Sequence, residues 1–322
     1  MTDFNERLPN YQDIEQAYSL IKSYINKTPV LTSESIDKIL GCSVFLKCEN
    51  FQKVGAFKYR GATNSVLQLT DEEAKRGVAT HSSGNHAAAL ALAAKKRGIP
   101  AYIVMPENAP SIKKKAVAGY GGIITFCTPT QQAREETLAQ IQKETGATFI
   151  HPYNNFDVIC GQGTASLELM NEINSIDIVI APVGGGGLLS GTATYIKGKF
   201  PNVKVHGAEP QNADDAFRSV RDKTIYPSVN PKTIADGLLT SLCPLTYTII
   251  SQECDRIITV SEDSIINAMR MIWERMKIII EPSSAVPIAA IMDNPDDFNG
   301  KRVGVIISGG NVDLDNLPWI KR

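Results

Sequence analysis

The sequence has little that would place it in a membrane, on nucleic acid or in an oxidising compartment. None of its 322 residues belongs to a run approaching the roughly 20 apolar residues of a membrane span, and the polar first residues carry no apolar signal run. The formal net charge is −1, so neither nucleic acid nor an acidic membrane surface is an expected partner. The six cysteines are scattered, and no pair has the two-residue spacing of a zinc or redox site. We expect a soluble, cytoplasmic protein with free thiols.

The chain also lacks a fixed-period repeat, a low-complexity tract and a linker rich in proline, glycine or serine. Apolar residues at helical spacing predict a helix over 11–26, and residues 70–73 have the form of a capping box that opens a short helix. From residue 77 onward, short apolar runs alternate with helix-like segments. The clearest of these cover residues 77–81, 85–97, 101–105, 176–180, 262–276 and 303–307. Such alternation predicts parallel sheets covered by helices on both faces. Two α/β blocks meet near residue 153, and residues 211–232 are expected to be irregular.

One lysine, Lys58, lies between two aromatic residues in a segment that joins a strand-like run to a helix-like one. Lys53 and Arg60 are nearby cations. An amine that is partly desolvated beside other cations loses proton affinity and becomes a nucleophile, which is what a Schiff-base lysine needs. Taken alone, however, this segment fits a solvated lysine at the start of an amphipathic helix better.

Four consecutive glycines at 184–187 follow an apolar run and precede a helix-like segment. They free several backbone N–H groups to point at one place, and a helix N-terminus adds its positive dipole end, so the pair suits a phosphate. A plain tight turn needs fewer glycines. No Gly-Lys-Ser/Thr follows, which excludes a P-loop, and G-x-G-x-x-G has no complete match. Glu209 stands where a ribose-binding acid would lie, so a nucleotide-binding protein stays an alternative.

Three polar segments complete the candidates. Residues 82–86, Ser-Ser-Gly-Asn-His, open a helix and suit a carboxylate, although a serine there can act only as an N-cap. Residues 308–311, Ser-Gly-Gly-Asn, end the last strand, where ligands bind in open α/β sheets, although an ordinary turn fits equally well. Glu209, Asp214 and Asp215 offer oxygen ligands for Mg²⁺ or Ca²⁺, but such acidic segments are more often simply solvated.

Together these segments resemble the fold-type II pyridoxal-phosphate enzymes, and within them the group of serine racemases, serine/threonine dehydratases and threo-3-hydroxyaspartate dehydratases. The segments that carry the resemblance are residues 47–52, 55–58, 82–86, 184–187 and 308–311. The resemblance implies a tryptophan synthase β-like α/β fold with two open parallel-sheet domains covered by helices. Residues 1–76 and 154–322 would form a large cofactor-binding domain, and residues 77–153 a small mobile domain that closes over substrate. It also implies a homodimer.

The resemblance assigns roles to single residues. Lys58 would be the Schiff-base lysine and the base on one face of the substrate Cα, and Ser83 would offer a proton on the opposite face. Contacts to pyridoxal 5′-phosphate would come from Phe57, Lys58, Asn85, Gly184, Gly185, Gly186, Gly187, Leu188 and Ser308. Contacts to the amino-acid substrate would come from Ser82, Ser83, Asn85 and His86. A divalent cation, Mg²⁺ or another, would be held by Glu209, the carbonyl of Ala213 and Asp215.

Within the cofactor set, Asn85 would bond the ring hydroxyl, and Phe57 would pack beside the ring. The glycine run with Leu188 would hold the phosphate. Ser308 would face the pyridine nitrogen, and a neutral partner there would leave that nitrogen largely unprotonated.

The implied activity is that of an ammonia-lyase, or dehydratase, acting on a small β-hydroxy amino acid such as serine, threonine or 3-hydroxyaspartate. β-Elimination would release a keto acid and ammonia, and Ser83 permits racemisation to the D-enantiomer as well. Two features depart from the family pattern. Residues 31–34 differ from the Thr-Ser-Ser that helps to bind ATP in animal serine racemases, and His81 stands where a smaller or apolar residue is expected.

Two other functions compete with this interpretation. A β-replacement synthase of the cysteine-synthase type shares the lysine, but the Ser-Ser-Gly-Asn-His segment and the acidic segment at 209–215 argue against it. A non-catalytic nucleotide-binding α/β protein would use the glycine run and Glu209, and it would leave Lys58 and Ser308 without a role.

Overall fold

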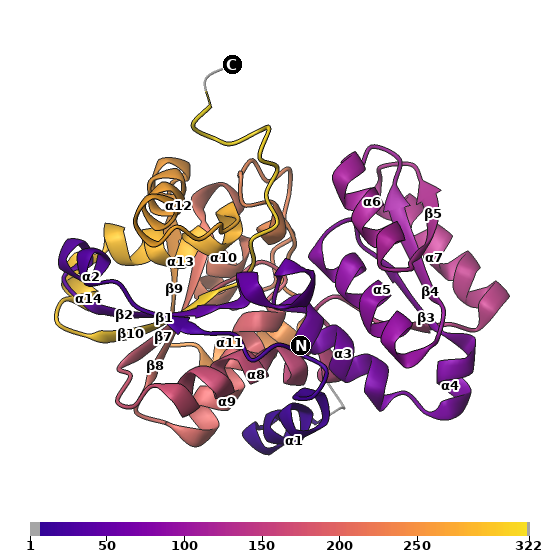
Figure 1. Cartoon of the computed structure of the whole chain (residues 1–322), viewed down its shortest axis with the longest axis horizontal. Helices are drawn as coiled ribbons and strands as arrows, with labels where there is room; N and C mark the ends of the chain where they lie inside the picture. Colours follow the sequence, from indigo (N-terminus) through magenta and orange to yellow (C-terminus); the bar gives the residue numbers. More distant parts are fainter. Residues whose placement is uncertain (1–6, 321–322) are drawn as a thin grey trace.

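The computed structural model describes residues 7–320 and contains two separate β-sheets with helices packed on them (Figure 1). The six-stranded sheet has the order β1 (Val30–Leu31), β2 (Ser43–Cys48), β10 (Arg302–Ile307), β7 (Ile178–Pro182), β8 (Lys204–Pro210) and β9 (Arg256–Val260). The four-stranded sheet has the order β5 (Ile123–Cys127), β4 (Ala101–Pro106), β3 (Val78–His81) and β6 (Thr148–Phe149). Every strand pair is parallel except β1 with β2. The predicted α/β class with two parallel sheets is therefore confirmed.

The helices divide between the two sheets. Those around the larger sheet are α1 (Tyr11–Ile21), α2 (Glu34–Leu40), α3 (Lys58–Gln68), α8 (Phe156–Glu172), α9 (Gly187–Lys199), α10 (Asp215–Asp222), α11 (Pro244–Glu253), α12 (Glu262–Met276), α13 (Pro282–Asp293) and α14 (Pro295–Phe298). Those with the smaller sheet are α4 (Asp71–Arg76), α5 (Asn85–Arg97), α6 (Ser111–Gly119) and α7 (Gln131–Thr145). The mobility and boundaries of a 77–153 domain stay a prediction. Within residues 7–320, no helix is long and apolar enough to cross a membrane.

Helix boundaries follow local chemistry where caps are present in the sequence. α5 and α12 begin and end where their patterns predict. α5 ends at Gly98, whose φ of 74° is a left-handed cap conformation that favours glycine. α4 begins with the predicted capping box, in which Thr70 and Glu73 exchange side-chain and backbone hydrogen bonds.

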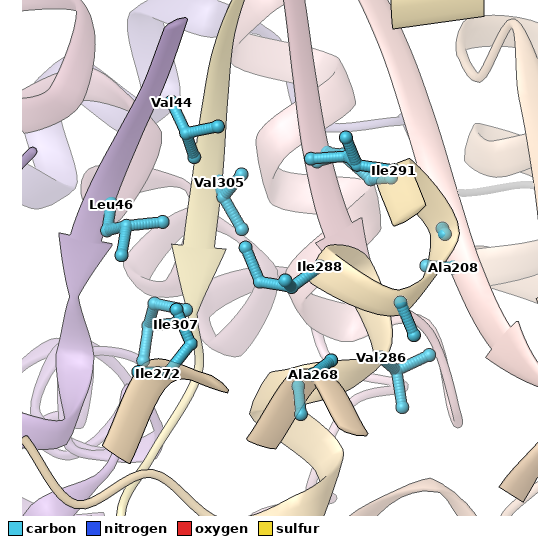
Figure 2. Close-up of a cluster of buried hydrophobic side chains, with 14 of the residues drawn as sticks. Val44, Leu46, Ala208, Ala268, Ile272, Val286, Ile288, Ile291, Val305 and Ile307 are labelled. Atoms are coloured by element: carbon cyan, nitrogen blue, oxygen red, sulfur yellow. The ribbon is translucent and has the colours of Figure 1, made fainter. Parts of the chain in front are cut away.

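The main core lies between the larger sheet and the helices α12 and α13. Figure 2 shows alternate residues of two strands, Val44 and Leu46 on β2 and Val305 and Ile307 on β10, on the side of the sheet where Ile288 of α13 lies. Each of these side chains is almost fully buried, and each such burial contributes about 1.5–3 kcal/mol. The packing fixes the parallel register of the two strands, which pairs Ile307 with Cys48.

That register brings two distant segments of the chain together at the strand ends. The Phe57 N–H donates to the Ser308 carbonyl at 2.9 Å, and Ala56 forms a bridge with Gly309. The lysine segment and the 308–311 segment are therefore neighbours because of the core beneath them.

The prediction that residues 211–232 are irregular is wrong for its first part. Residues 211–213 form a short 3₁₀ turn and α10 starts at Asp215. The carboxylate of Glu209 on β8 accepts hydrogen bonds from the N–H groups of Ala216 and Phe217 at 2.9 and 2.8 Å. A residue outside the helix thus accepts hydrogen bonds from the free N–H groups of the first turn, and the sequence contains no local capping residue that would predict the start of the helix.

Five further elements were not predicted, and one predicted helix was too long. The missed elements are β1, α2, α11, β9 and α14. The helix expected over 11–26 ends at Ile21.

Candidate active site

A cavity of about 740 Å³ is lined by segments that follow strands of both sheets. It is lined by every residue predicted to contact cofactor or substrate: Phe57, Lys58, Ser82, Ser83, Asn85, His86, Gly184, Gly185, Gly186, Gly187, Leu188 and Ser308. The predicted metal residues Glu209, Ala213 and Asp215 are not among its lining residues. One cavity therefore collects the segments that were far apart in the sequence.

Lys58 is the first residue of α3, and its amine is held inside this cavity. Its Nζ donates to the Pro152 carbonyl at 2.9 Å and lies 5.2 Å from the centre of the Phe57 ring. Burial lowers the pKa of Lys58 to about 8, because removal from water disfavours the charged amine. About a tenth of the amine is therefore in the neutral, nucleophilic and basic form at pH 7, and about half at pH 8.

The low proton affinity of Lys58 was predicted; of the two predicted causes, desolvation is confirmed and the neighbouring cations are wrong. Arg60 points away into a buried ionic network with Glu49 and Glu168, and the Lys53 amine bonds the Tyr24 carbonyl. Burial is what lowers the pKa of Lys58, and the nearby Glu281 carboxylate raises it. The sequence distance of a cation says nothing about where its side chain points.

The glycine run forms the turn before α9. Gly186 has a φ of +88°, which a side chain would strain, and it is the N-cap of the helix. A Cβ on Gly185 would lie 2.4 Å from the Tyr153 ring. The free first N–H groups of α9 and the helix dipole face this turn. The turn before α9 therefore has room for a phosphate, and the free N–H groups and the helix dipole supply partial positive charge to bind it.

The segment 82–86 lies between β3 and α5. The N-cap of α5 is Gly84, which makes no side-chain cap bond, so the alternative that these serines serve only as caps fails. Ser82 Oγ accepts a long bond of 3.4 Å from the Gly84 N–H. Across residues 7–320, no hydrogen bond is recorded for the Ser83 hydroxyl, which faces the cavity. Both hydroxyls and the α5 N-terminus are therefore placed to bind a carboxylate.

His86 is buried and neutral. Its Nε2 lies 3.0 Å from the Ile150 carbonyl oxygen, and since a carbonyl only accepts, Nε2 carries the proton. Its Nδ1 is then an acceptor, and it is buried without a partner in the described part of the chain. Burial and the neighbouring Lys58 lower the pKa of His86 to about 3. His86 therefore brings no positive charge to the cavity.

Sequence reasoning missed Glu281 and did not assign Asn311. The Asn85 amide donates to both Glu281 carboxylate oxygens at 3.1 and 3.2 Å, and the Asn311 amide donates to Asn85 Oδ1 at 2.9 Å. Burial raises the pKa of Glu281 to about 7. Asn311 belonged to a recognised motif, but Glu281 stands alone between an apolar run and a proline-led helix, and only that break in polarity could have pointed to it.

The side of the cavity formed by the smaller sheet carries the cation Arg134 and two imidazole rings whose pKa values burial lowers. His81, His151 and Arg134 line it. Arg134 Nε is buried and has no hydrogen-bond partner within residues 7–320. The Arg134 side chain also makes no ion pair in the described residues, so its charge is available to an anionic ligand group in the cavity. Glu135 also lines the cavity but is exposed.

The candidate cation site lies apart from the cavity. Both Asp215 carboxylate oxygens are buried without a hydrogen-bond partner in the described residues, and burial raises the pKa of Asp215 to about 6. Burial also raises the pKa of Glu209 well above its usual range. Within residues 7–320, no group of three or more His, Cys, Asp or Glu side chains gathers as a metal site. Two carboxylates with backbone carbonyls are the donor set that a hard cation would use.

The position of Glu209 bears on the nucleotide-binding alternative. Its carboxylate is fully buried and bonded to the first turn of α10. It is not placed as a ribose-binding acid.

The cavity fits pyridoxal phosphate on its own chemistry. It offers an amine for an aldehyde, a side-chain-free helix start for a phosphate, and the buried hydroxyl of Ser308 at the end of β10.

Comparison with known proteins agrees with this geometry. The family model described as pyridoxal-phosphate dependent enzyme matches residues 21–309. A β-hydroxyaspartate dehydratase of Paracoccus denitrificans is 51% identical over 312 residues, which cover 97% of this chain and 99% of that protein. A serine racemase of Dictyostelium discoideum is 51% identical over 96% of this chain and 97% of its own length. The crystal structure of serine racemase from that organism superposes with a TM-score of 0.92 over 95% of this chain and 99% of that one. The chain therefore belongs to the family of pyridoxal-phosphate-dependent enzymes.

Proposed function

We propose that this enzyme is an ammonia-lyase that removes water and ammonia from a small β-hydroxy amino acid, with 3-hydroxyaspartate as its preferred substrate. The observation that carries the reaction type is the amine of Lys58, with a pKa near 8, in one cavity with the serine segment and the glycine run. The two relatives named above, a dehydratase and a racemase, support the same class of substrate.

The residues that would hold the cofactor follow from the site. Lys58 would hold the aldehyde carbon, the glycine run with Leu188 the phosphate, Asn85 the ring hydroxyl, and Ser308 the ring nitrogen, with Phe57 beside the ring. When bound, pyridoxal phosphate would supply an electron sink for the substrate carbon next to the amine.

The protein's own contribution is to bind, orient and move protons. Ser82, Ser83 and the N-terminus of α5 would hold the substrate carboxylate with neutral donors. The neutral amine of Lys58 would take the Cα proton. His86 carries no charge, so it leaves the proton affinity of Lys58 to burial and Glu281.

The preference for a dicarboxylic substrate rests on Arg134. Its side chain lines the cavity and makes no ion pair within residues 7–320, so its charge matches a second carboxylate, which serine and threonine lack. A hydrogen bond to a charged group contributes about 1.5–3 kcal/mol. Replacing Arg134 with glutamine should therefore lower kcat/KM for 3-hydroxyaspartate by about 10- to 100-fold while changing that for serine by less than about threefold.

The deciding assay measures keto acid release on 3-hydroxyaspartate, serine and threonine, with chiral analysis of the remaining amino acid. Lys58→Ala should abolish keto acid release on all three. Arg134→Lys, which keeps the charge, is the matched control for Arg134→Gln. If Arg134→Gln lowers kcat/KM equally for serine and for 3-hydroxyaspartate, the proposed preference is refuted. Keto acid release by Lys58→Ala would refute the assignment of the base.

A second activity, racemisation, is favoured by the Ser83 hydroxyl. Ser83 lines the cavity together with Lys58, and removal of a proton by one residue and its return by another inverts the centre. Ser83→Ala should lower D-enantiomer formation more than keto acid release. Equal losses of both would contradict a proton-donor role.

We also propose a divalent cation, Mg²⁺, at Glu209, the Ala213 carbonyl and Asp215, supported by the unpaired oxygens of Asp215. A homodimer in the cytoplasm completes the proposal, and its basis is the resemblance in sequence. Light scattering of the purified holoenzyme tests the dimer, and dialysis against a chelator followed by metal analysis tests the cation.

A further inference from the structure

His151 lines the cavity from the segment that leaves the smaller sheet after β6. Its Nδ1 lies 2.9 Å from the Asn154 nitrogen and 3.3 Å from the Tyr153 nitrogen. A backbone N–H can only donate, so Nδ1 accepts and carries no hydrogen. The hydrogen of the neutral ring is therefore on Nε2, and the main chain fixes this tautomer.

The same contacts keep the ring of His151 neutral. Protonation would put a hydrogen on Nδ1, where it would face the two N–H groups. Burial, with smaller contributions from His81 and Lys58, lowers the pKa of His151 to about 4. The titratable groups that face the ring are Lys58 from α3, His81 from the end of β3, His86 from α5 and Tyr153 from the same segment. None of these four carries a negative charge at neutral pH, so they do not favour an imidazolium.

The Nε2 hydrogen of His151 has no acceptor in the protein. Within residues 7–320 the hydrogen bonds of this ring are the two at Nδ1, although the side chain lines the cavity. Ligand cavities use a few fixed polar groups of this kind to orient what they bind. Nε2 is therefore available to an oxygen of a bound molecule.

The neighbours of His151 place it between the base and the cation of the cavity. The carbonyl of Pro152, the next residue, accepts from the Lys58 amine at 2.9 Å. The His81 ring lies 6.5 Å from the His151 ring, centre to centre, and burial and the Arg134 charge both lower the pKa of His81. The order along the wall is thus Lys58, His151, His81 and Arg134. In a substrate whose Cα faces Lys58 and whose chain extends toward Arg134, the β-carbon faces His151.

We propose that His151 is a specificity-determining residue that donates its Nε2 hydrogen to the β-hydroxyl oxygen of the substrate. The substrate carboxylate is assigned to the serine segment and the cofactor phosphate to the glycine run, so the β-hydroxyl is the remaining oxygen beside Lys58. A neutral donor binds it without adding a cation that would lower the proton affinity of Lys58 further. The inference rests on the proposed elimination from a β-hydroxy amino acid.

Two substitutions separate the roles of the two ring nitrogens. In His151→Asn, the amide oxygen takes the place of Nδ1 and accepts from the Tyr153 and Asn154 N–H groups, while no donor reaches the position of Nε2. In His151→Gln, the longer side chain brings an amide nitrogen to the position of Nε2, so the donor is kept. The asparagine variant therefore preserves the segment and removes only the proposed contact.

The assay compares elimination from serine with elimination from β-chloroalanine by the enzyme loaded with pyridoxal phosphate. The two substrates differ only in the β-substituent, and chlorine is a much weaker hydrogen-bond acceptor than a hydroxyl oxygen. His151→Asn should lower the ratio of kcat/KM for serine to that for β-chloroalanine by about 5- to 100-fold, because the enclosed hydroxyl loses its partner. His151→Gln should restore this ratio to within about threefold of the wild type.

The tautomer is measured independently of the reaction. In enzyme labelled with ¹⁵N-histidine, NMR from pH 5 to 8 should show a protonated Nε2 and an unprotonated Nδ1 for His151, and the loss of these signals in His151→Asn assigns them. A hydrogen on Nδ1 would overturn the proposal.

Equal losses on serine and β-chloroalanine in His151→Asn would leave the ratio unchanged and would also overturn the proposal, as would a ratio that falls equally in the asparagine and glutamine variants. If the wild type releases no keto acid from either substrate, the proposed function itself fails, which differs from an active wild type whose ratio does not depend on His151.

Discussion

Replacing Arg60 with methionine tests how the first turn of α3 is held. Arg60 lies two residues after Lys58 and is fully buried with Glu49, Glu168 and Lys47. Its guanidinium pairs with Glu49 at 2.7 and 2.8 Å and with Glu168 at 2.9 and 2.8 Å. The Lys47 amine adds a contact of 2.7 Å to Glu168. Two buried cations, Lys47 of β2 and Arg60 of α3, are thereby balanced by two buried carboxylates. Glu49 comes from the turn after β2, and Glu168 comes from α8.

The loss of Arg60 leaves the two carboxylates in different situations. Glu168 keeps Lys47. Among the described residues, Glu49 keeps only the Thr28 hydroxyl, at 2.6 Å. Stranding one member of a buried pair costs about 3–5 kcal/mol, because an uncompensated charge remains in the interior. At roughly 2 °C per kcal/mol for a chain of this size, the thermal midpoint should fall by about 6–10 °C.

The assay is thermal unfolding of the cofactor-free protein at pH 7, followed by circular dichroism and calorimetry. Arg256→Met is the surface control, since the Arg256–Asp297 pair is 45% and 47% exposed and such pairs contribute about 1 kcal/mol or less. The double variant Arg60→Met/Glu49→Leu removes the stranded charge and should recover much of the loss. The reasoning is refuted if Arg60→Met lowers the thermal midpoint no further than Arg256→Met does, or if the double variant is no more stable than Arg60→Met alone.

Three other predictions concern the cavity and the cation site. The rate at which the cofactor-free protein captures pyridoxal phosphate, measured by stopped-flow absorbance, should rise about tenfold per pH unit up to the Lys58 pKa near 8 and then level off. Glu281→Gln should move this plateau to lower pH, because the Glu281 carboxylate raises the Lys58 pKa. A pH-independent rate would contradict the role of the neutral amine. Mg²⁺ should raise the thermal midpoint only as pH rises through about 6, where Asp215 loses its proton; a shift that is equal at pH 5 and 8, or that survives Asp215→Asn, would remove this residue from the site. Lys113→Ala breaks the 2.6 Å ion pair between α6 and Asp236 at the cavity wall and should raise KM by about two- to fivefold with little change in kcat. Adding Asp236→Ala to this variant should raise KM no further. Increases in KM that add up in the double variant would argue against a pairwise role.

Much of the fold could be predicted because its signals are local. The apolar alternation gives the parallel sheets, and glycine or serine caps fix the ends of α5 and α12. α10 escaped prediction because its first turn is satisfied by Glu209 from another strand. The end of α1 was placed too late because apolar spacing continues past Ile21 to Ile25, which is buried outside the helix.

The candidate site could be predicted only where its residues sit in motifs. Lys58, the glycine run, residues 82–86 and Ser308 are all marked by unusual local composition, and one cavity collects them. Glu281 and Arg134 reach the cavity through the tertiary fold and carry no local mark. The same limit explains why neighbouring cations were wrongly expected to lower the Lys58 pKa, because only packing shows that Arg60 turns away to Glu49.

The arrangement of charge in the cavity explains how a lysine stays usable as a base there. A cation placed close to Lys58 to bind the substrate carboxylate would be expensive to bury and would compete for Glu281. The cavity uses neutral donors instead, namely serine hydroxyls and a helix N-terminus, and His86 is kept neutral with a pKa near 3. The pKa of Lys58 is then set by burial against a single carboxylate, Glu281, whose own pKa burial raises to about 7. Since Glu281 also holds the Asn85 amide, a substitution at Glu281 should disturb the proton affinity of the base and the position of a cofactor ligand together.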